Sequence, residues 1–240
     1  FMEQAFHCPR ELGSVIRGGR EIVATKGLFI TKKRYAVLYI DKENKRQDVN
    51  GKPGKIKAMG LDLKRSDTPK VIQEFLSDIL DDVLNGARRD AIVEKIREFK
   101  YKFTERPGWE KGSPKRVNNL TKYGEEEKRL GKANMPGHVR AALNWNTMRR
   151  MQGDNYSMQI VDGAKVIVCK LKSNPLEYNS VAYPVDELRL PQWFKDLPFD
   201  DALMEQTVID EKLENLIGVL EWDISSTRND NNFSKLFDFE

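Results

Sequence analysis

The hydrophobic pattern of the sequence changes abruptly at Thr68–Pro69, and this change constrains the fold more than any other feature. Before it, residues 26–41 are rich in β-branched and aromatic residues, which predicts two strands, and residues 56–64 predict a third. After it, apolar residues recur at three- and four-residue steps up to Gly86, which is typical of an amphipathic helix. We therefore expect an α+β fold: a small antiparallel sheet followed by a mainly helical region.

The same helical periodicity returns three more times along the chain. It predicts a second helix over residues 92–103, which ends before Pro107–Gly108, a third over residues 139–151, and a last over residues 203–220.

Two further segments interrupt the helices. Residues 104–136 have little apolar periodicity and many Lys, Arg, Gly and Pro residues, which predicts a long surface loop, and a loop of that length favours a function. Residues 158–172 predict a β-hairpin that turns at Asp162–Gly163. The polar composition beyond Trp222 is typical of a flexible tether.

Charge is distributed unevenly along the chain. The formal net charge is +4, but residues 1–67 and 102–150 hold a large excess of Lys and Arg, whereas residues 151–240 are acidic. Two basic stretches favour a polyanionic partner such as nucleic acid. From charge alone, solvated loops are an equally good explanation.

Composition argues against several other classes of protein. No apolar run is long enough to cross a bilayer and no secretory signal begins the sequence, so we expect a cytoplasmic protein without membrane contact. Only Cys8, Cys169, His7 and His138 are available as soft ligands, so we expect neither a disulfide framework nor a metal site in this chain.

Three consecutive cations stand at the start of a predicted strand, in the segment Thr31–Ala36. Lys32, Lys33 and Arg34 repel one another unless solvent or an anion screens them, and Tyr35 can pack against a sugar or base edge. Taken alone, such a triplet is more often part of a solvated loop.

The surrounding segments resemble the family B DNA polymerases. Residues 27–36 are similar to the palm segment in which Lys-Lys-Arg/Lys-Tyr follows a Gly-aromatic strand, and residues 59–67 to the segment where the palm passes into the thumb. Residues 112–124 and 136–146 resemble the thumb of the branch found in large tailed phages. The resemblance implies that residues 1–67 form the C-terminal part of the palm, 68–224 the thumb, and 225–240 a tail.

The resemblance also implies which residues contact primer–template DNA. Lys32 and Lys33 would reach minor-groove acceptors or backbone oxygens that all correctly paired steps share, and Arg34 and Tyr35 would support the primer strand. Three of the remaining cations, between residues 57 and 65, would contact the DNA backbone or stabilise the protein itself. The candidates after residue 112 would form a thumb tip that holds duplex phosphates, assisted by His138 and Arg140. For His138, a capping or core role is the alternative. The remaining DNA-binding candidates are Lys57, Lys64, Arg65, Lys115, Arg116, Asn118, Lys122, Tyr123, His138 and Arg140.

The catalytic motifs of the family do not occur in the printed sequence. Family members use two aspartate motifs, Asp-x-x-Ser-Leu-Tyr-Pro and Tyr-Gly-Asp-Thr-Asp-Ser, to hold the two metal ions of nucleotidyl transfer. The resemblance implies that Mg²⁺ is bound mainly by another part of the polymerase, with Glu21 as an auxiliary acidic residue. We therefore expect the isolated chain to be inactive.

The C-terminal peptide carries Leu236, Phe237 and Phe239 on a polar tether. Clustered apolar residues at a chain end favour a docking peptide over a packing patch on the body. Phage polymerases end in a similar peptide that inserts into the sliding clamp, so the resemblance implies a clamp contact amplified by tethering.

Three functions remain open from the sequence. The first is the C-terminal part of a phage DNA polymerase, possibly the smaller subunit of a split enzyme whose partner carries the rest, in the cytoplasm of the infected bacterial host. The second is a non-enzymatic adaptor that binds duplex DNA and recruits the clamp. The third is an RNA-binding translational regulator.

Overall fold

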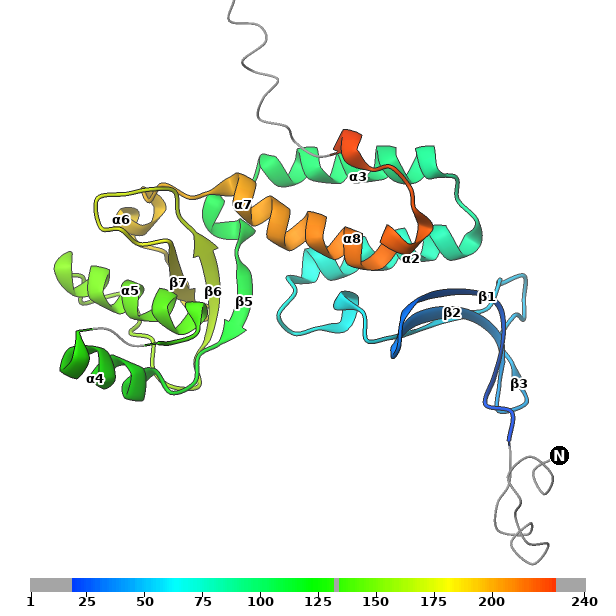
Figure 1. The fold of residues 1–240 in the computed structure, drawn as a ribbon, viewed down its shortest axis with the longest axis horizontal. Helices are drawn as coiled ribbons and strands as arrows, with labels where there is room; N and C mark the ends of the chain where they lie inside the picture. The colour runs from blue at the N-terminus through cyan, green and yellow to red at the C-terminus, as the bar shows by residue number, and fades with distance from the viewer. Residues whose placement is uncertain (1–18, 132–133, 228–240) are drawn as a thin grey trace, which may run out of the picture. The chain divides into compact units, whose positions relative to one another are not determined.

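A computed structural model describes residues 19–131 and 134–227, and it confirms the α+β class (Figure 1). The chain divides into two compact units. The strand unit extends to Gly60 and includes Leu84–Gly86, and the larger unit contains Leu61–Val83 and the chain from Ala87 onward. Each unit is described by itself.

The strand unit is built around one central strand. Strand β2 pairs antiparallel with β1 along one edge and with β3 and β4 along the other. Leu28, Ala36 and Ala58 lie opposite one another across three of these strands, and all three are buried. Because register partners point to the same face, one face of the sheet has an apolar centre. The strands are β1 (Ile22–Thr31), β2 (Arg34–Lys42), β3 (Lys45–Arg46) and β4 (Lys55–Met59).

The predicted strands are confirmed, with two changes of boundary, and the first strand begins at Ile22, before the predicted start at residue 26. The third strand ends at Met59, and Asp62–Lys64 form a 3-10 turn in place of its predicted second half. Gly60 forms a bend directly after the strand, with φ of 65°, a conformation that glycine adopts without steric cost.

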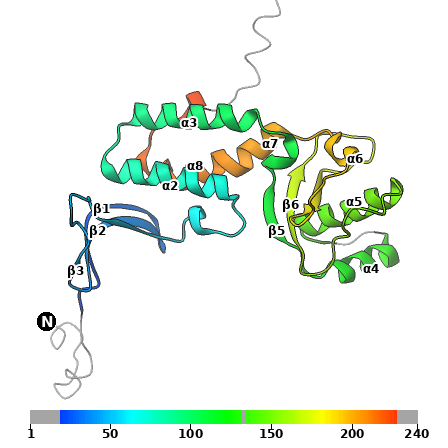
Figure 2. The same cartoon turned by 180° about the vertical axis from the view of Figure 1, so that it is seen from behind.

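The larger unit begins with a layer of helices, which lie side by side in Figures 1 and 2. The predicted helices form because their apolar residues face one another: Phe75 and Phe99 stack with ring centroids 3.8 Å apart. A π-helical segment, Gln206–Asp210, joins the last two helices, so the predicted final helix is present but is not uniformly α-helical. The helices are α2 (Lys70–Asn85), α3 (Arg89–Thr104), α7 (Asp201–Glu205) and α8 (Glu211–Ile217).

A buried lysine on α3 connects that helix to α7 and to the π-helical segment through ion pairs. Lys100 on α3 is 3% exposed, and its Nζ lies 3.3 Å from Glu205 Oε1 and 2.5 Å from Asp210 Oδ1. It also donates a 2.7 Å hydrogen bond to the carbonyl of Thr227. A buried ammonium requires such partners. The packed chain therefore extends to Thr227, while the rest of the predicted tail lies outside the described residues.

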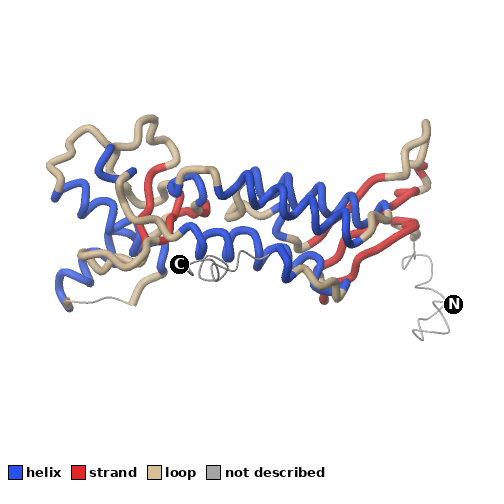
Figure 3. The backbone as a smooth tube through the Cα atoms, turned by 90° about the horizontal axis from the view of Figure 1, so that it is seen from above, coloured by secondary structure: helices blue, strands red, loops and turns tan. Residues whose placement is uncertain are grey.

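The second half of the larger unit is a three-stranded antiparallel sheet in the order β5-β6-β7, with helices on it (Figure 3). Trp145 lies at the centre of its core, fully buried, with the ring centroids of Trp193 and Phe194 at 5.1 and 5.2 Å. These elements are β5 (Ser113–Arg116), α4 (Leu120–Leu130), α5 (Gly137–Met151), β6 (Lys165–Lys170), β7 (Ser180–Pro184) and α6 (Gln192–Lys195).

Two predictions for this region are wrong. Residues 104–136 are not a long loop, because β5 pairs with β6 and α4 follows it. Residues 158–172 do not form a hairpin: β6 pairs with β5 and β7, and the segment before Asp162 is held by the side chain of Asn146, which bonds both backbone groups of Ile160. The turn at Asp162–Gly163 is present.

Within residues 19–131 and 134–227, no helix combines the length and apolar character that crossing a membrane requires.

Candidate nucleic-acid interface

The basic triplet of the sequence lies at the tight turn between β1 and β2. Thr31 pairs with Arg34, so Lys32 and Lys33 are the two residues of the turn, and both are exposed. Lys33 adopts a left-handed conformation with φ of 69°, which is uncommon for a residue with a long side chain. Neither lysine makes an ion pair with any residue of the described chain. The turn therefore presents two available ammonium groups.

Gly60, from the second family-like segment (residues 59–67), packs closely against the backbone of this turn. A Cβ atom at Gly60 would collide with the carbonyl oxygen of Lys33 and would lie 3.1 Å from Cγ of Arg34. Only glycine fits this close approach at positive φ. Tyr35 also pairs with Met59, so β2 and β4 bring together two motifs that are separated in the sequence.

An apolar row crosses the sheet beside the lysine turn. Phe29 and Met59 flank Tyr35 in register, and the Phe29 and Tyr35 rings stack with centroids 6.0 Å apart. Phe29 is 68% exposed and Met59 is 46% exposed. This row can pack against a sugar or against another apolar surface.

Glu21 and Lys57 form an ion pair at the surface of the strand unit, with Nζ 2.7 Å from Oε1. The hydrogen bond and charge of Lys57 lower the pKa of Glu21, and the same bond raises the pKa of Lys57. Among the described residues, no group of three or more His, Cys, Asp or Glu side chains is arranged to hold a metal ion. Glu21 thus neutralises a cation in this chain.

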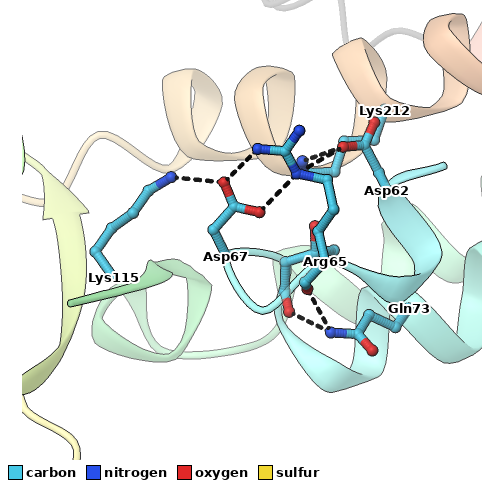
Figure 4. A network of polar contacts seen from close by, with 7 residues as sticks. Asp62, Arg65, Asp67, Gln73, Lys115 and Lys212 are labelled. Carbon is cyan, nitrogen blue, oxygen red and sulfur yellow. Dashed lines mark hydrogen bonds and ion pairs between the residues drawn. The ribbon is translucent and has the colours of Figure 1, made fainter. Parts of the chain in front are cut away.

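In the larger unit, Asp67 organises a network of cations (Figure 4). Arg65 donates two hydrogen bonds to its carboxylate, of 2.9 and 3.0 Å, and Lys115 donates a third of 3.0 Å. Arg65 also lies 3.5 Å from Asp62, which faces Lys212 at 3.5 Å. The bonds from Arg65 and then Lys115 hold the pKa of Asp67 far below its usual range. Asp67 is thus ion-paired with an arginine and a lysine.

A cavity of about 320 Å³ adjoins this network. It is lined by Lys115 and by His138 at the start of α5, together with two cations that the sequence did not single out, Lys170 on β6 and Lys212 on α8. Partial burial, helped by the charge of Lys115, lowers the pKa of His138 below its usual range. Asp67 and Glu211 offset part of the positive charge of the cavity.

The predicted thumb tip is an ordered turn between β5 and α4. Arg116, Asn118 and Lys122 are exposed and make no ion pair within the described part of the chain. The carboxylate of Asp162 accepts bonds from the backbone N–H groups of Leu120 and Thr121 and a 2.8 Å bond from the Thr121 hydroxyl. A distant carboxylate therefore caps α4 and fixes the turn.

The other predicted DNA-binding residues differ in their exposure and in their contacts. Lys64 is exposed, Tyr123 packs against the core of the sheet, and Arg140 is paired with Glu127 on α4. Arg34 is half-buried in β2. The clamp-binding candidates Leu236, Phe237 and Phe239 lie outside the described residues.

Comparison with known proteins gives a consistent match. A family model described as DNA polymerase family B matches residues 17–177. The chain is 30% identical over 183 residues to a DNA-directed DNA polymerase of Enterobacteria phage T4, covering 76% of this chain and 19% of the relative. It is 31% identical over 195 residues to that of Escherichia phage RB69, covering 78% and 19%. The chain thus spans about a fifth of the length of these relatives.

The Asp67 network predicts a pH-dependent stability. Asp67→Asn should lower the free energy of unfolding at pH 7 by about 1–3 kcal/mol, because hydrogen bonds to a charged group are removed. The folded-state pKa of Asp67 lies below its ordinary value of 3.8. The stabilisation is therefore complete above about pH 5 and declines as the pH falls below 3.8. Denaturant titrations from pH 7 to pH 3 should show a constant difference between wild type and variant down to about pH 5 and a shrinking difference below it.

All four tryptophans lie beyond Leu61, so their fluorescence reports unfolding of the larger unit. Asp90→Asn is the matched control, because Asp90 is 91% exposed beside Arg89 and its substitution should change little. A variant difference that stays constant down to pH 3 would contradict the assignment.

Proposed function

The chain belongs to DNA polymerase family B, and from that premise we propose that it is the palm edge, thumb and clamp-binding tail of a phage replicative DNA polymerase. In this proposal it grips the primer–template duplex in the cytoplasm of the infected bacterial host. Nucleotidyl transfer is completed by a segment or subunit that carries the rest of the palm and the fingers. The match over residues 17–177 is the observation that carries the proposal.

The lysine turn is proposed to read correct pairing without reading sequence. Lys32 and Lys33 are exposed at a turn whose backbone is held against Gly60, so their ammonium groups extend from a rigid support. The minor groove offers acceptors at every correctly paired step, which a point charge can contact without discriminating bases. Tyr35, beside the turn, would pack along the primer strand.

The thumb tip is proposed to hold backbone phosphates. Arg116 and Lys122 are unpaired within the described residues, whereas Lys115 and Arg65 are held by Asp67 and Lys57 by Glu21. A cation already paired with a carboxylate gains less from a phosphate than an unpaired one does. We therefore assign direct phosphate contact to Arg116 and Lys122, with Asn118 between them, and a positioning role to Lys115.

Metal chemistry is proposed to belong to another part of the polymerase. Two Mg²⁺ ions, when bound there, would activate the primer hydroxyl and stabilise the leaving pyrophosphate. Glu21 is the candidate auxiliary carboxylate in this chain. To act near the metal ions it would have to break its ion pair with Lys57.

Reconstitution tests the enzyme assignment. We expect the chain to be inactive alone and to restore primer extension when it is co-expressed with the polypeptide of the same genome that carries the two aspartate motifs. Asn substitutions in those motifs should abolish extension in the mixture. Two folded polypeptides that never associate, or extension by this chain alone, would contradict the proposal and favour the adaptor.

Charge reversal tests the thumb tip. Arg116→Glu with Lys122→Glu should weaken binding to blunt duplex DNA and flatten the dependence of log K on log salt concentration by about 0.9 for each phosphate that is no longer neutralised. Sequence preference should not change. Fluorescence anisotropy at several salt concentrations measures both quantities, with Lys172→Glu and Arg189→Glu together, two exposed cations elsewhere on this unit, as the control for net charge. An unchanged slope would remove the assignment.

The tail is proposed to dock on the sliding clamp through Leu236, Phe237 and Phe239. Phe237→Ala with Phe239→Ala should abolish binding to the clamp in a pull-down while leaving duplex affinity unchanged, because the tether does not contribute to the DNA grip. Ser234→Ala, in the same peptide, is the control. Persistent clamp binding by the double variant would disprove this contact.

A further inference from the structure

A groove of about 520 Å³ lies between α4, α5 and the segment Gln159–Asp162. It is larger than the cavity beside Asp67 and falls within the range of small-ligand sites. None of the residues assigned above to duplex contact lines it. The residues that line it combine an apolar floor with a cationic rim.

The floor is formed by Leu120, Leu143 and Ile160, with Gly124 on α4 opposite Leu143. A Cβ atom at Gly124 would be in ordinary van der Waals contact with Cδ2 of Leu143, at 3.4 Å, so α4 contributes backbone and no side chain at this point of the floor. The side-chain amide of Asn146 donates to the carbonyl of Ile160 and accepts from its backbone N–H, which holds that wall in place. The floor is therefore preformed and apolar.

The rim carries Lys128, Arg149 and Arg150, none of which makes an ion pair in the part of the chain that the structure describes. Arg149 donates its Nε to the carbonyl of Ser157 at 2.7 Å, which fixes the guanidinium and leaves its terminal nitrogens available. Of the two carboxylates in the groove, Asp162 is engaged as the cap of α4 and Glu125 remains on the rim. The rim thus has an excess of positive charge.

An apolar floor beside three cations matches the two halves of a nucleotide. The guanidinium and ammonium groups suit a phosphodiester, and the aliphatic floor suits the face of a base. In a duplex that face is covered by stacking, so only an unpaired nucleotide can present it. The groove therefore differs in its ligand from an interface that follows duplex phosphates.

We propose that the groove between α4 and α5 binds an unpaired nucleotide of single-stranded DNA adjoining the duplex, with its phosphate on Arg149, Arg150 and Lys128 and its base on Leu143 and Ile160. The proposal rests on the DNA-binding function above, since it presumes that DNA is the polyanion that approaches this unit. It gives the chain a second DNA-binding site, one that recognises single-stranded character.

The experiment compares three fluorescein-labelled probes on the full chain: a blunt duplex, the same duplex with a thymidine overhang, and the same overhang made of abasic residues. Wild type should bind the thymidine overhang more tightly than the blunt duplex, and the abasic overhang roughly fivefold or more weakly than the thymidine one, the low end for base stacking.

Lys128→Glu with Arg150→Glu should remove the preference for the overhang and reduce the salt slope by about 0.7 for each single-strand phosphate that is no longer neutralised. Arg149→Gln, which keeps a polar group near Ser157, should act in the same direction. The matched control is Lys172→Glu with Arg189→Glu, two exposed cations outside the groove. Tryptophan fluorescence should show unchanged unfolding midpoints in both double variants.

An equal reduction of affinity for blunt and overhanging duplex would overturn the proposal, because the groove would then be part of the duplex grip. A preference for the overhang that persists in the Lys128→Glu/Arg150→Glu variant and in Arg149→Gln would overturn it as well. If wild type failed to bind blunt duplex but bound the overhang through Lys128 and Arg150, the thumb-tip assignment would fail while the groove stood.

Discussion

The carboxylate of Asp162 fixes the region on which both proposed DNA-binding sites of the larger unit depend. It binds the first backbone N–H groups of α4 and the Thr121 hydroxyl, and nearby backbone bonds join Val117 to Ala164 and to Gly163. A helix of eleven residues with little buried surface is marginal by itself, so its position depends on this cap. The turn that we propose to contact the duplex precedes the cap, and the groove follows it. Both would lose their geometry if α4 detached.

Pairing within the chain separates the cations into two kinds. Lys57, Arg65, Lys115 and Arg140 face carboxylates at close range, and their ion pairs position backbone and helices. Lys32, Lys33, Arg116 and Lys122 are exposed and make no ion pair among the described residues, so an approaching phosphate need not displace a carboxylate. Net charge alone does not reveal this difference, since both kinds occur in the same basic stretches. The proposed electrostatic attraction to DNA therefore depends on the ion-pair partners of the cations more than on the number of cations.

The sequence predicted the elements whose stability is local. Residues 70–85 and 89–104 are helices because their own periodicity creates an apolar face, and β1 and β2 are joined by a two-residue turn. It failed where stability comes from distant partners. Ser113–Arg116 has no alternating apolar pattern and becomes a strand by pairing with β6, and α4 is capped from residue 162. The apparent first strand of the hairpin fails because Asn146 satisfies the backbone of Ile160, which a ladder would otherwise do.

The candidate sites divide in the same way. The lysine turn could be found because its residues are adjacent in sequence and belong to a family-like segment, and the support by Gly60 explains physically why that segment needs its glycine. Lys170 and Lys212 reach the cavity of Lys115 from other elements, so no local pattern indicates them. Lys128, Arg149 and Arg150 belong to no motif in the sequence, and the composition of residues 104–136 predicts a loop where α4 forms. Only the packing of α4 on α5 brings them around an apolar floor, and a site created by tertiary packing has no signature in either helix alone.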